Sequence, residues 1–460
     1  MNKSRLLCIT AGLAMFLSGS VMGAERAYFG AGNGTADSPY WVENVEHLQN
    51  VRLFPNAYFI QTKDIEAGDE VFRPICDFNT PFTGHYNGEG HRITINELGY
   101  TEGDIKLAGI WGFTSGAEIK NLNVDVYASL KLDGRVCAGG ITACANNTDI
   151  RGCSISSDSK LEVASERCLY VGGIVGYSAF GSSVKSCSFD GKIDGRSNGS
   201  IEAVCAVGGI VGENRTGSSI TKSTFTETAS VYGGSTDAPA WIGGIAGFNE
   251  DFTFVCDCHA VVPQNVKPEY NGVKRVNTEI NKCNSAGSVN GYSRERVAVG
   301  GIAGFNVGSI TNCVAQASAL AKGNIIKCGE SPSALIGGVV GDNNGTVYNT
   351  SSLATIQTLS DGFLAVGGVA GRNTGEINSC KFFAVSGKGL SSFTSLRSFN
   401  VLSALSSVSA RGGIAGINDN SRNNAVIENS KVYGNNKEEA ITTYGHTRSA
   451  YGEIVGLQIK

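Results

Sequence analysis

Proline, methionine and tryptophan are scarce in this 460-residue chain, which has 8, 3 and 3 copies of them respectively. Glycine, in contrast, occurs 62 times, well above the roughly 7% of an average protein. The scarcity of proline excludes a collagen-like repeat and argues against a disordered linker. Abundant glycine with little proline instead indicates many tight turns between short strands.

Basic runs are also missing, and the formal net charge is −4. The chain therefore lacks the electrostatic pattern of a nucleic-acid-binding protein, and we expect no nucleic-acid partner. The His-Glu-x-x-His motif of zinc proteases does not occur. We predict no catalytic, cofactor-binding or metal-binding residues, and no cofactor.

One apolar stretch stands out, at the N-terminus. Lys3 and Arg5 precede "LLCITAGLAMFL", and the small residues of "SGSVMGA" follow. This order is typical of a secretory signal peptide, cleaved near Gly23 or Ala24, and the apolar run is short for a bilayer span. We expect residues 1–24 to be a signal peptide and the mature chain to contain no transmembrane segment. The predicted location is secreted or at the cell surface of a bacterium, with the periplasm as an alternative.

A glycine pair followed by a β-branched residue recurs along the chain. "VGGIVG" occurs twice, at Val171–Gly176 and Val207–Gly212, and related segments begin 30 to 57 residues after one another. The first glycines of the set are Gly139, Gly172, Gly208, Gly243, Gly300, Gly337, Gly367 and Gly412. A period of this size is the signature of a repeat architecture.

Each repeat contains a second element, in which a β-branched residue precedes Cys, Ser or Thr by three positions. The small residues of this set are Cys153, Cys187, Ser223, Cys283, Cys313, Thr350, Cys380 and Ser430. One repeat thus holds about three short strand-like pieces, which are too short and too β-branched for helices. A unit of this size buries its apolar face only by stacking on its neighbours. We therefore predict an all-β fold, a parallel right-handed β-helix of about nine turns.

These residues resemble the GLUG-motif repeats of bacterial secreted and surface proteins. The "GG-[IV]-x-G" core and the "I-x-N/S-C" element carry the resemblance. "GNGTADSPYWVENVEHLQNV" (32–51) and "FTGHYNGEGHRI" (82–93) are similar to the opening stretches of such proteins. The resemblance implies export and a surface context, because GLUG repeats occur in adhesin-like proteins and in the non-catalytic part of some immunoglobulin A-cleaving metallopeptidases.

The predicted organisation has three parts. A signal peptide (1–24) precedes an N-terminal cap (25–105), whose "VENVEHLQNV" segment should form a short helix over the first turn. The β-helix follows (106–460), with insertions at about 249–278 and 382–410. Since open strand edges invite pairing, the far end of the rod suggests end-to-end self-association.

The cysteines number 14, and removal of Cys8 with the signal peptide leaves an odd number outside the cell. Interchange with Ser and Thr indicates a column of small buried side chains. A thiol stack and cross-turn disulfides both remain open for Cys153 with Cys187 and for Cys283 with Cys313. Cys168 and Cys205 form another candidate bridge. Cys256 and Cys258 lie in the first insertion, where a disulfide that closes the loop is favoured and a zinc site is the less favoured alternative.

The insertions are the predicted contact surfaces. Phe252, Phe254 and Tyr270 in the first and Arg397 in the second are candidate binding residues. His85 and His91 are metal-ligand residue types, but their spacing matches no zinc motif, so we predict no metal site there. The acids Asp190, Asp194, Glu213, Asp342 and Glu376 are interpreted as solvated turn residues.

We therefore expect an adhesin-like binding or display scaffold and not an enzyme. Its loops would contact a host or matrix protein or glycan. Two alternatives remain open: a carbohydrate-active β-helix enzyme, which needs clustered acids on one groove, and a structural envelope component.

Overall fold

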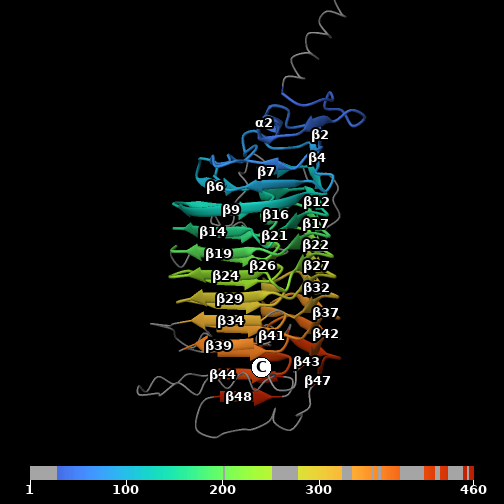
Figure 1. The fold of residues 1–460 in the computed structure, drawn as a ribbon. Coiled ribbons are helices and arrows are strands. Elements are labelled where there is room, and N and C mark those ends of the chain that lie inside the picture. Colours follow the sequence, from blue (N-terminus) through green and yellow to red (C-terminus); the bar gives the residue numbers. More distant parts are fainter. Residues whose placement is uncertain are drawn as a thin grey trace, which may run out of the picture.

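The computed structural model describes residues 28–199, 203–250, 278–316, 318–323, 334–354, 356–360, 364–383, 409–419, 425–433, 449–452 and 455–459. Over these residues the chain winds into stacked coils that form a rod, with the N-terminal strands at one end and the C-terminal strands at the other (Figure 1). All strand pairs are parallel, and each strand pairs with its counterpart in the next coil. The predicted parallel β-helix is confirmed.

One coil contains five short strands, where the sequence suggested about three. In a representative coil these are β15 (Leu169–Gly172), β16 (Val175–Ala179), β17 (Ser183–Lys185), β18 (Ser188–Phe189) and β19 (Lys192–Ser197). Equivalent strands of successive coils form sheets 1 to 5, numbered in this order. Strands of two or three residues, such as β17 and β18, show too little alternation to be recognised singly in a sequence.

Sheets 1 and 2 flank the glycine pair and contain ten strands each in the described part of the chain, so the number of turns differs slightly from the nine predicted. Sheet 1 contains β6 (Ile105–Ala108), β10 (Arg135–Gly139), β15, β20 (Cys205–Gly208), β25 (Ala240–Gly243), β30 (Val297–Gly300), β35 (Ala334–Gly337), β40 (Leu364–Gly367), β44 (Ser409–Gly412) and β48 (Ser449–Gly452). Sheet 2 contains β7 (Trp111–Ser115), β11 (Thr142–Asn146), β16, β21 (Val211–Arg215), β26 (Ala246–Glu250), β31 (Ala303–Asn306), β36 (Val340–Asn343), β41 (Ala370–Asn373), β45 (Ala415–Asp419) and β49 (Val455–Ile459).

Sheet 3 carries the isoleucine of the second repeat element and is the longest, with twelve strands. It contains β1 (Tyr40–Val42), β2 (Tyr58–Gln61), β4 (His85–Asn87), β8 (Glu118–Lys120), β12 (Asp149–Arg151), β17, β22 (Ser219–Thr221), β27 (Glu279–Asn281), β32 (Ser309–Thr311), β37 (Thr346–Tyr348), β42 (Glu376–Asn378) and β46 (Val426–Glu428).

Sheets 4 and 5 complete the coil and share the long strand β9 (Asn123–Leu132), which pairs with both β13 and β14. Sheet 4 contains β3 (Ile65–Glu66), β5 (Arg92–Ile95), β9, β13 (Ser154–Ile155), β18, β23 (Thr224–Phe225), β28 (Asn284–Ser285), β33 (Val314–Ala315), β38 (Ser351–Ser352), β43 (Lys381–Phe383) and β47 (Lys431–Tyr433). Sheet 5 contains β9, β14 (Lys160–Ser165), β19, β24 (Ser230–Ser235), β29 (Ser288–Ser293), β34 (Ser318–Gly323) and β39 (Ile356–Ser360).

The doubled glycines form one corner of the rod, between sheets 1 and 2. The register joins Gly172 to Gly208 and continues through the first glycines of the other coils. A Cβ on Gly172 would lie 2.0 Å from the carbonyl oxygen of Val175 and 2.7 Å from the amide nitrogen of Gly212. Because backbone fills this space on both sides, only glycine fits, and the motif repeats once per coil.

The N-terminal residues cover the first coils with sheet and a short helix. The helix α2 (Val45–Asn50) begins at Asn44, whose side-chain oxygen accepts a hydrogen bond from the amide of His47 at 2.9 Å. It continues into the 3₁₀ helix η1 (Val51–Leu53), and both Leu48 and Val51 are fully buried. The predicted short helix is confirmed. Strands β1 and β2 extend sheet 3 to this end of the rod.

A ladder of asparagine side chains runs inside the rod where sheet 2 ends. The Nδ2 atom of each asparagine donates to the Oδ1 atom of the next, at 2.8 to 2.9 Å. The members are Asn214, Asn249, Asn306, Asn343, Asn373 and Asn418. All are buried, and the Nδ2 groups donate within the ladder and to nearby carbonyl groups, whereas the Oδ1 atom of Asn214 at the start of the ladder has no hydrogen-bond partner.

Candidate functional site

Several residues singled out in the sequence lie outside the described part of the chain. These are Phe252, Phe254, Cys256, Cys258 and Tyr270 in the first insertion and Arg397 in the second. Their roles remain predictions. The signal peptide (1–24) lies outside the described residues as well.

The repeat cysteines form a buried column between sheets 3 and 4. Cys153, Cys187, Cys283 and Cys313 are at most 2% exposed, and each is a free thiol. The Sγ atom of Cys153 lies 3.9 Å from the carbonyl oxygen of Ile119 in the preceding coil. Hydrogen bonding to Cys187 and burial raise the pKa of the Cys153 thiol well above its ordinary value, so it is a weak nucleophile.

Cys168 and Cys205 do not lie opposite one another. The register pairs Leu169 with Cys205, so Cys168 is offset by one position. A shift of one residue turns a side chain to the other face of a sheet. Accordingly, Cys205 packs in the main core, while Cys168 joins a second apolar cluster with Tyr170 and Tyr177. Both thiols are free in the structure.

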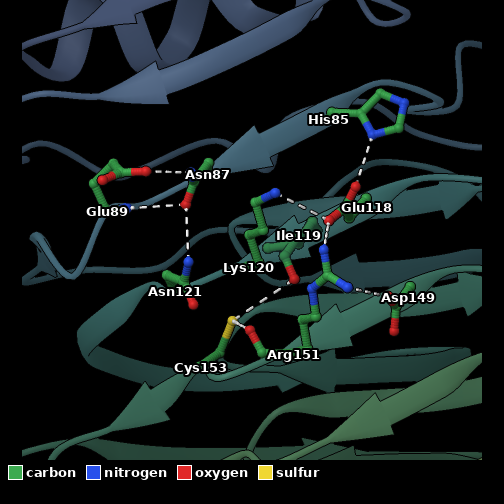
Figure 2. A network of polar contacts seen from close by, with 10 residues as sticks. All are labelled: His85, Asn87, Glu89, Glu118, Ile119, Lys120, Asn121, Asp149, Arg151 and Cys153. Atoms are coloured by element: carbon green, nitrogen blue, oxygen red, sulfur yellow. Dashed lines mark hydrogen bonds and ion pairs between the residues drawn. The ribbon is translucent and has the colours of Figure 1, made fainter. Parts of the chain in front are cut away.

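The most elaborate accessible polar arrangement that we find in the described part of the rod lies on the outer face of sheet 3, on β4, β8 and β12 (Figure 2). Glu118 is its centre. The Glu118 carboxylate contacts His85 Nδ1 at 3.1 Å and Lys120 Nζ at 3.3 Å, and it also pairs with Arg151. Arg151 in turn lies 3.6 Å from Asp149. These side chains come from three adjacent coils and meet because the strands are in register.

Partial burial acts to raise the pKa of Glu118, but hydrogen bonds from His85 and Lys120 outweigh it and hold this pKa below its usual value. Glu118 is therefore a carboxylate over the physiological pH range. Amide groups flank the ion pairs. The Nδ2 atom of Asn121 donates to Oδ1 of Asn87 at 3.2 Å. The cluster therefore offers anionic, cationic and amide groups on one face.

A hollow of about 150 Å³ lies beside this network. Ala36, Pro39, Tyr58, His85 and Glu118 are among the residues that line it. The rings of Tyr58 and His85 stack, with centroids 4.1 Å apart and an interplanar angle of 6°. An aromatic surface next to polar groups is typical of a site that recognises a small group by stacking and hydrogen bonding. Glu118 is the single carboxylate among the lining residues, so the hollow does not hold an acid pair of the glycosidase type.

His85 and His91 have separate partners. His85 contacts Glu118, and His91 Nδ1 lies 3.2 Å from Asp64. Within the described ranges no group of three or more His, Cys, Asp or Glu side chains is arranged to hold a metal ion. The sequence analysis missed Glu118 and Arg151. Alignment of "EIK" (118–120) with "DIR" (149–151) would have placed like positions of adjacent coils together.

The interpretation of Glu213 and Asp342 as solvated turn residues was wrong. Both are fully buried and occupy equivalent positions in sheet 2, beside the glycine corner. Asp342 is held by two hydrogen bonds of 2.9 Å from Arg372 and by Arg296. A charged residue beside a glycine-rich turn is usually exposed. Here the tight glycine corner brings sheets 1 and 2 close together, so Asp342 is covered.

Glu213 has a less complete set of partners. Its carboxylate lies 3.6 Å from Arg215, and Glu250 lies 3.4 Å from the same guanidinium. Neither oxygen of Glu213 has a hydrogen-bond partner. Burial therefore dominates and raises the pKa of Glu213 to about 8, although Arg215 opposes the shift. Since these acids are buried, they do not form the open acidic groove that a carbohydrate-active enzyme requires.

The stacked in-register coils define a parallel β-helix repeat protein. The GLUG motif matches residues 168–194, which begin just before β15 and end within β19. The predicted resemblance to GLUG-motif repeat proteins is therefore confirmed.

Two relatives match parts of the chain. A protein of Evansella cellulosilytica named "Putative Gly-rich membrane protein" is 35% identical over 114 residues, which are 23% of this chain and 13% of that protein. "Halomucin" of Haloquadratum walsbyi is 32% identical over 106 residues, 20% of this chain and 1% of that protein. The chain thus spans only a small part of the length of these relatives.

A solved structure with partial likeness is described as a "putative immunoglobulin A1 protease from Bacteroides ovatus". It shares 16% sequence identity with this chain at a TM-score of 0.42, over 72% of this chain and 80% of that one. In the described residues, no helix is long and apolar enough to cross a membrane.

Proposed function

We propose that this protein is an exported, adhesin-like scaffold that binds a host or matrix ligand on the side of a rigid β-helix. The signal peptide (1–24), the cap (25–105) and the repeat region (106–460) are parts of this proposal. A location at the cell surface agrees with the name of the membrane-protein relative.

One observation carries the proposal: the network around Glu118 beside the Tyr58–His85 stack. Its side chains belong to strands whose neighbours on both sides are paired, so ligand binding would require little ordering of the protein. The hollow lacks a second carboxylate, which favours binding over hydrolysis. The insertions at about 249–278 and 382–410 would add to the contact surface of the protein.

The test is an array of glycans and matrix proteins probed with the purified mature chain. We expect at least one ligand to bind, and Tyr58→Ala to weaken this binding because the stacking surface is lost. A second chain, in which a Gly-Ser linker replaces residues 251–277, measures the contribution of the first insertion and keeps Asn249 in its ladder. Binding of no ligand would contradict the proposal, as would steady breakdown of a polysaccharide.

A further inference from the structure

Basic side chains lie at the C-terminal ends of five successive strands of sheet 3. Lys120, Arg151 and Lys185 end β8, β12 and β17, and the register places each directly beside the next. Lys222 and Lys282 directly follow β22 and β27, the next two strands of the same sheet. The register pairs Lys185 with Thr221, so these two lysines lie one position further along the chain, at the corner after each strand. We call these five residues the basic stripe. Since parallel strands lie about 4.8 Å apart, the stripe is about 19 Å long.

This arrangement works against the stability of the rod. Lys120, Arg151 and Lys185 are directly opposite one another, and like charges on neighbouring strands repel. Lys222 and Lys282 follow paired strands and repel each other in the same way. Lys222 and Lys282 also have positive φ angles, of 52° and 55°, a conformation that favours Gly and Asn. The equivalent corner residues of later coils, Asn312 and Asn349, follow that preference. Selection for folding alone would therefore favour Asn or Gly at positions 222 and 282.

The stripe is also incompletely neutralised. Lys120 and Arg151 share the carboxylate of Glu118. Lys185, Lys222 and Lys282 are exposed, and among the described residues none of these three forms an ion pair. The chain as a whole carries a net charge of −4, so three unpaired cations at the ends of three adjacent strands are a local exception to its charge balance.

Hydrogen-bonding groups run parallel to the stripe. Ser154, Ser188, Thr224 and Asn284 begin consecutive strands of sheet 4 and are in register with one another. They are half-buried and follow the cations closely in the sequence of each coil. The Oδ1 atom of Asn284 is buried without a hydrogen-bond partner. The strands β17, β22 and β27 carry no aromatic side chain on which a nucleic-acid base could stack.

We propose that the basic stripe binds a linear acidic polysaccharide that lies along the rod axis. Regularly spaced carboxylate or sulfate groups would pair with the cations, and sugar hydroxyls would bond to the Ser, Thr and Asn column. This inference rests on the proposed binding function and specifies the chemistry of the ligand. The Glu118 network marks the end of the stripe nearest the cap.

The test measures binding of the mature chain to a polyuronate, a sulfated glycosaminoglycan, neutral dextran and single-stranded DNA, at low and at physiological salt. We expect salt-dependent binding to the two acidic polysaccharides and no binding to dextran. The variant Lys185→Gln/Lys222→Asn/Lys282→Asn should weaken polysaccharide binding by roughly tenfold or more, because three ionic contacts are lost. It should fold well, because Asn suits the two positive-φ positions.

The matched control is Lys131→Gln/Lys192→Gln/Lys431→Gln, which removes the same charge from exposed lysines elsewhere on the rod. It should bind like the unmodified chain. Equal loss in both triple variants, or binding to single-stranded DNA as tight as to the polysaccharides, would overturn the inference. If the array finds a ligand whose binding the stripe variant leaves unchanged, the stripe inference fails while the scaffold function stands. If the unmodified chain binds nothing, both fail.

Discussion

The rod places carboxylates in two opposite environments. At the glycine corner Glu213 is fully buried, lacks a hydrogen-bond partner and has its pKa raised to about 8. On the outer face of sheet 3, Glu118 contacts three basic side chains and has its pKa lowered. Both residues stand on short parallel strands. The difference shows that position in the coil, and not residue type, separates a structural carboxylate from one available for recognition.

The glycine corner creates the buried environment of Glu213, so substitution of a corner glycine should have the largest effect on stability. A Cβ at Gly337 would lie 1.9 Å from the carbonyl oxygen of Val340 and 2.5 Å from that of Val369. We expect Gly337→Ala to lower the free energy of unfolding by about 4 kcal/mol or more, because backbone must move. Denaturation in urea, followed by circular dichroism, measures this.

The control for that substitution is Gly234→Ala, where the nearest atom to a Cβ is 3.4 Å away in the Tyr232 side chain. Its cost should stay below about 1 kcal/mol. Similar losses for the two variants would show that the corner has no special need for glycine.

The next effect concerns the proton on Glu213. Its folded-state pKa, about 8, lies above the ordinary value of 4.5, so the folded state holds a proton that the unfolded state has released. The stability that this proton confers is full below about pH 4.5 and is lost as the pH rises toward 8. Glu213→Gln should therefore leave stability unchanged near pH 4 and raise it by a few kcal/mol near pH 9. Parallel stability curves for the two chains between these pH values would contradict the assignment.

The smallest effect on stability is expected on the open face. Glu118→Gln removes ion pairs that are exposed to solvent and screened, so the free energy of unfolding should fall by less than about 1 kcal/mol. Ligand binding should nevertheless change, since the variant frees Lys120 and Arg151 and removes the central carboxylate. Thermal unfolding and array binding, measured on the same preparation, test the two parts separately. A large loss of stability would show that Glu118 holds the fold together and would contradict its assignment to recognition.

Strong periodicity made much of this fold predictable. The doubled glycines and the Cys/Ser/Thr positions recur once per coil, and both sets occupy single ladders in the rod. The asparagine ladder was missed, although "G-x-N" follows several glycine pairs, as at Asn214 and Asn306. The G-x-N pattern is as regular as the pattern of the cysteines, but it did not enter the prediction of buried positions.

The sites were harder to predict than the fold. The contacts of Glu118 depend on which strands become neighbours, and those strands are 31 to 33 residues apart in the chain. The burial of Glu213 depends on how closely sheets 1 and 2 approach each other at the glycine corner. The amino-acid composition does not reveal this distance. A charged residue near glycine suggests exposure from local sequence alone, and the long-range packing of sheets 1 and 2 reverses that expectation.

The amides inside the rod all donate in one direction, from Asn214 toward Asn418. The two directions along the axis of the rod are therefore not equivalent, and we call the direction of donation its sense. Duplication of a whole coil would add one link and preserve this sense, whereas loss of a single amide would leave two ends facing each other without a bond. Change by entire coils is thus the route by which such a molecule can vary its length during evolution.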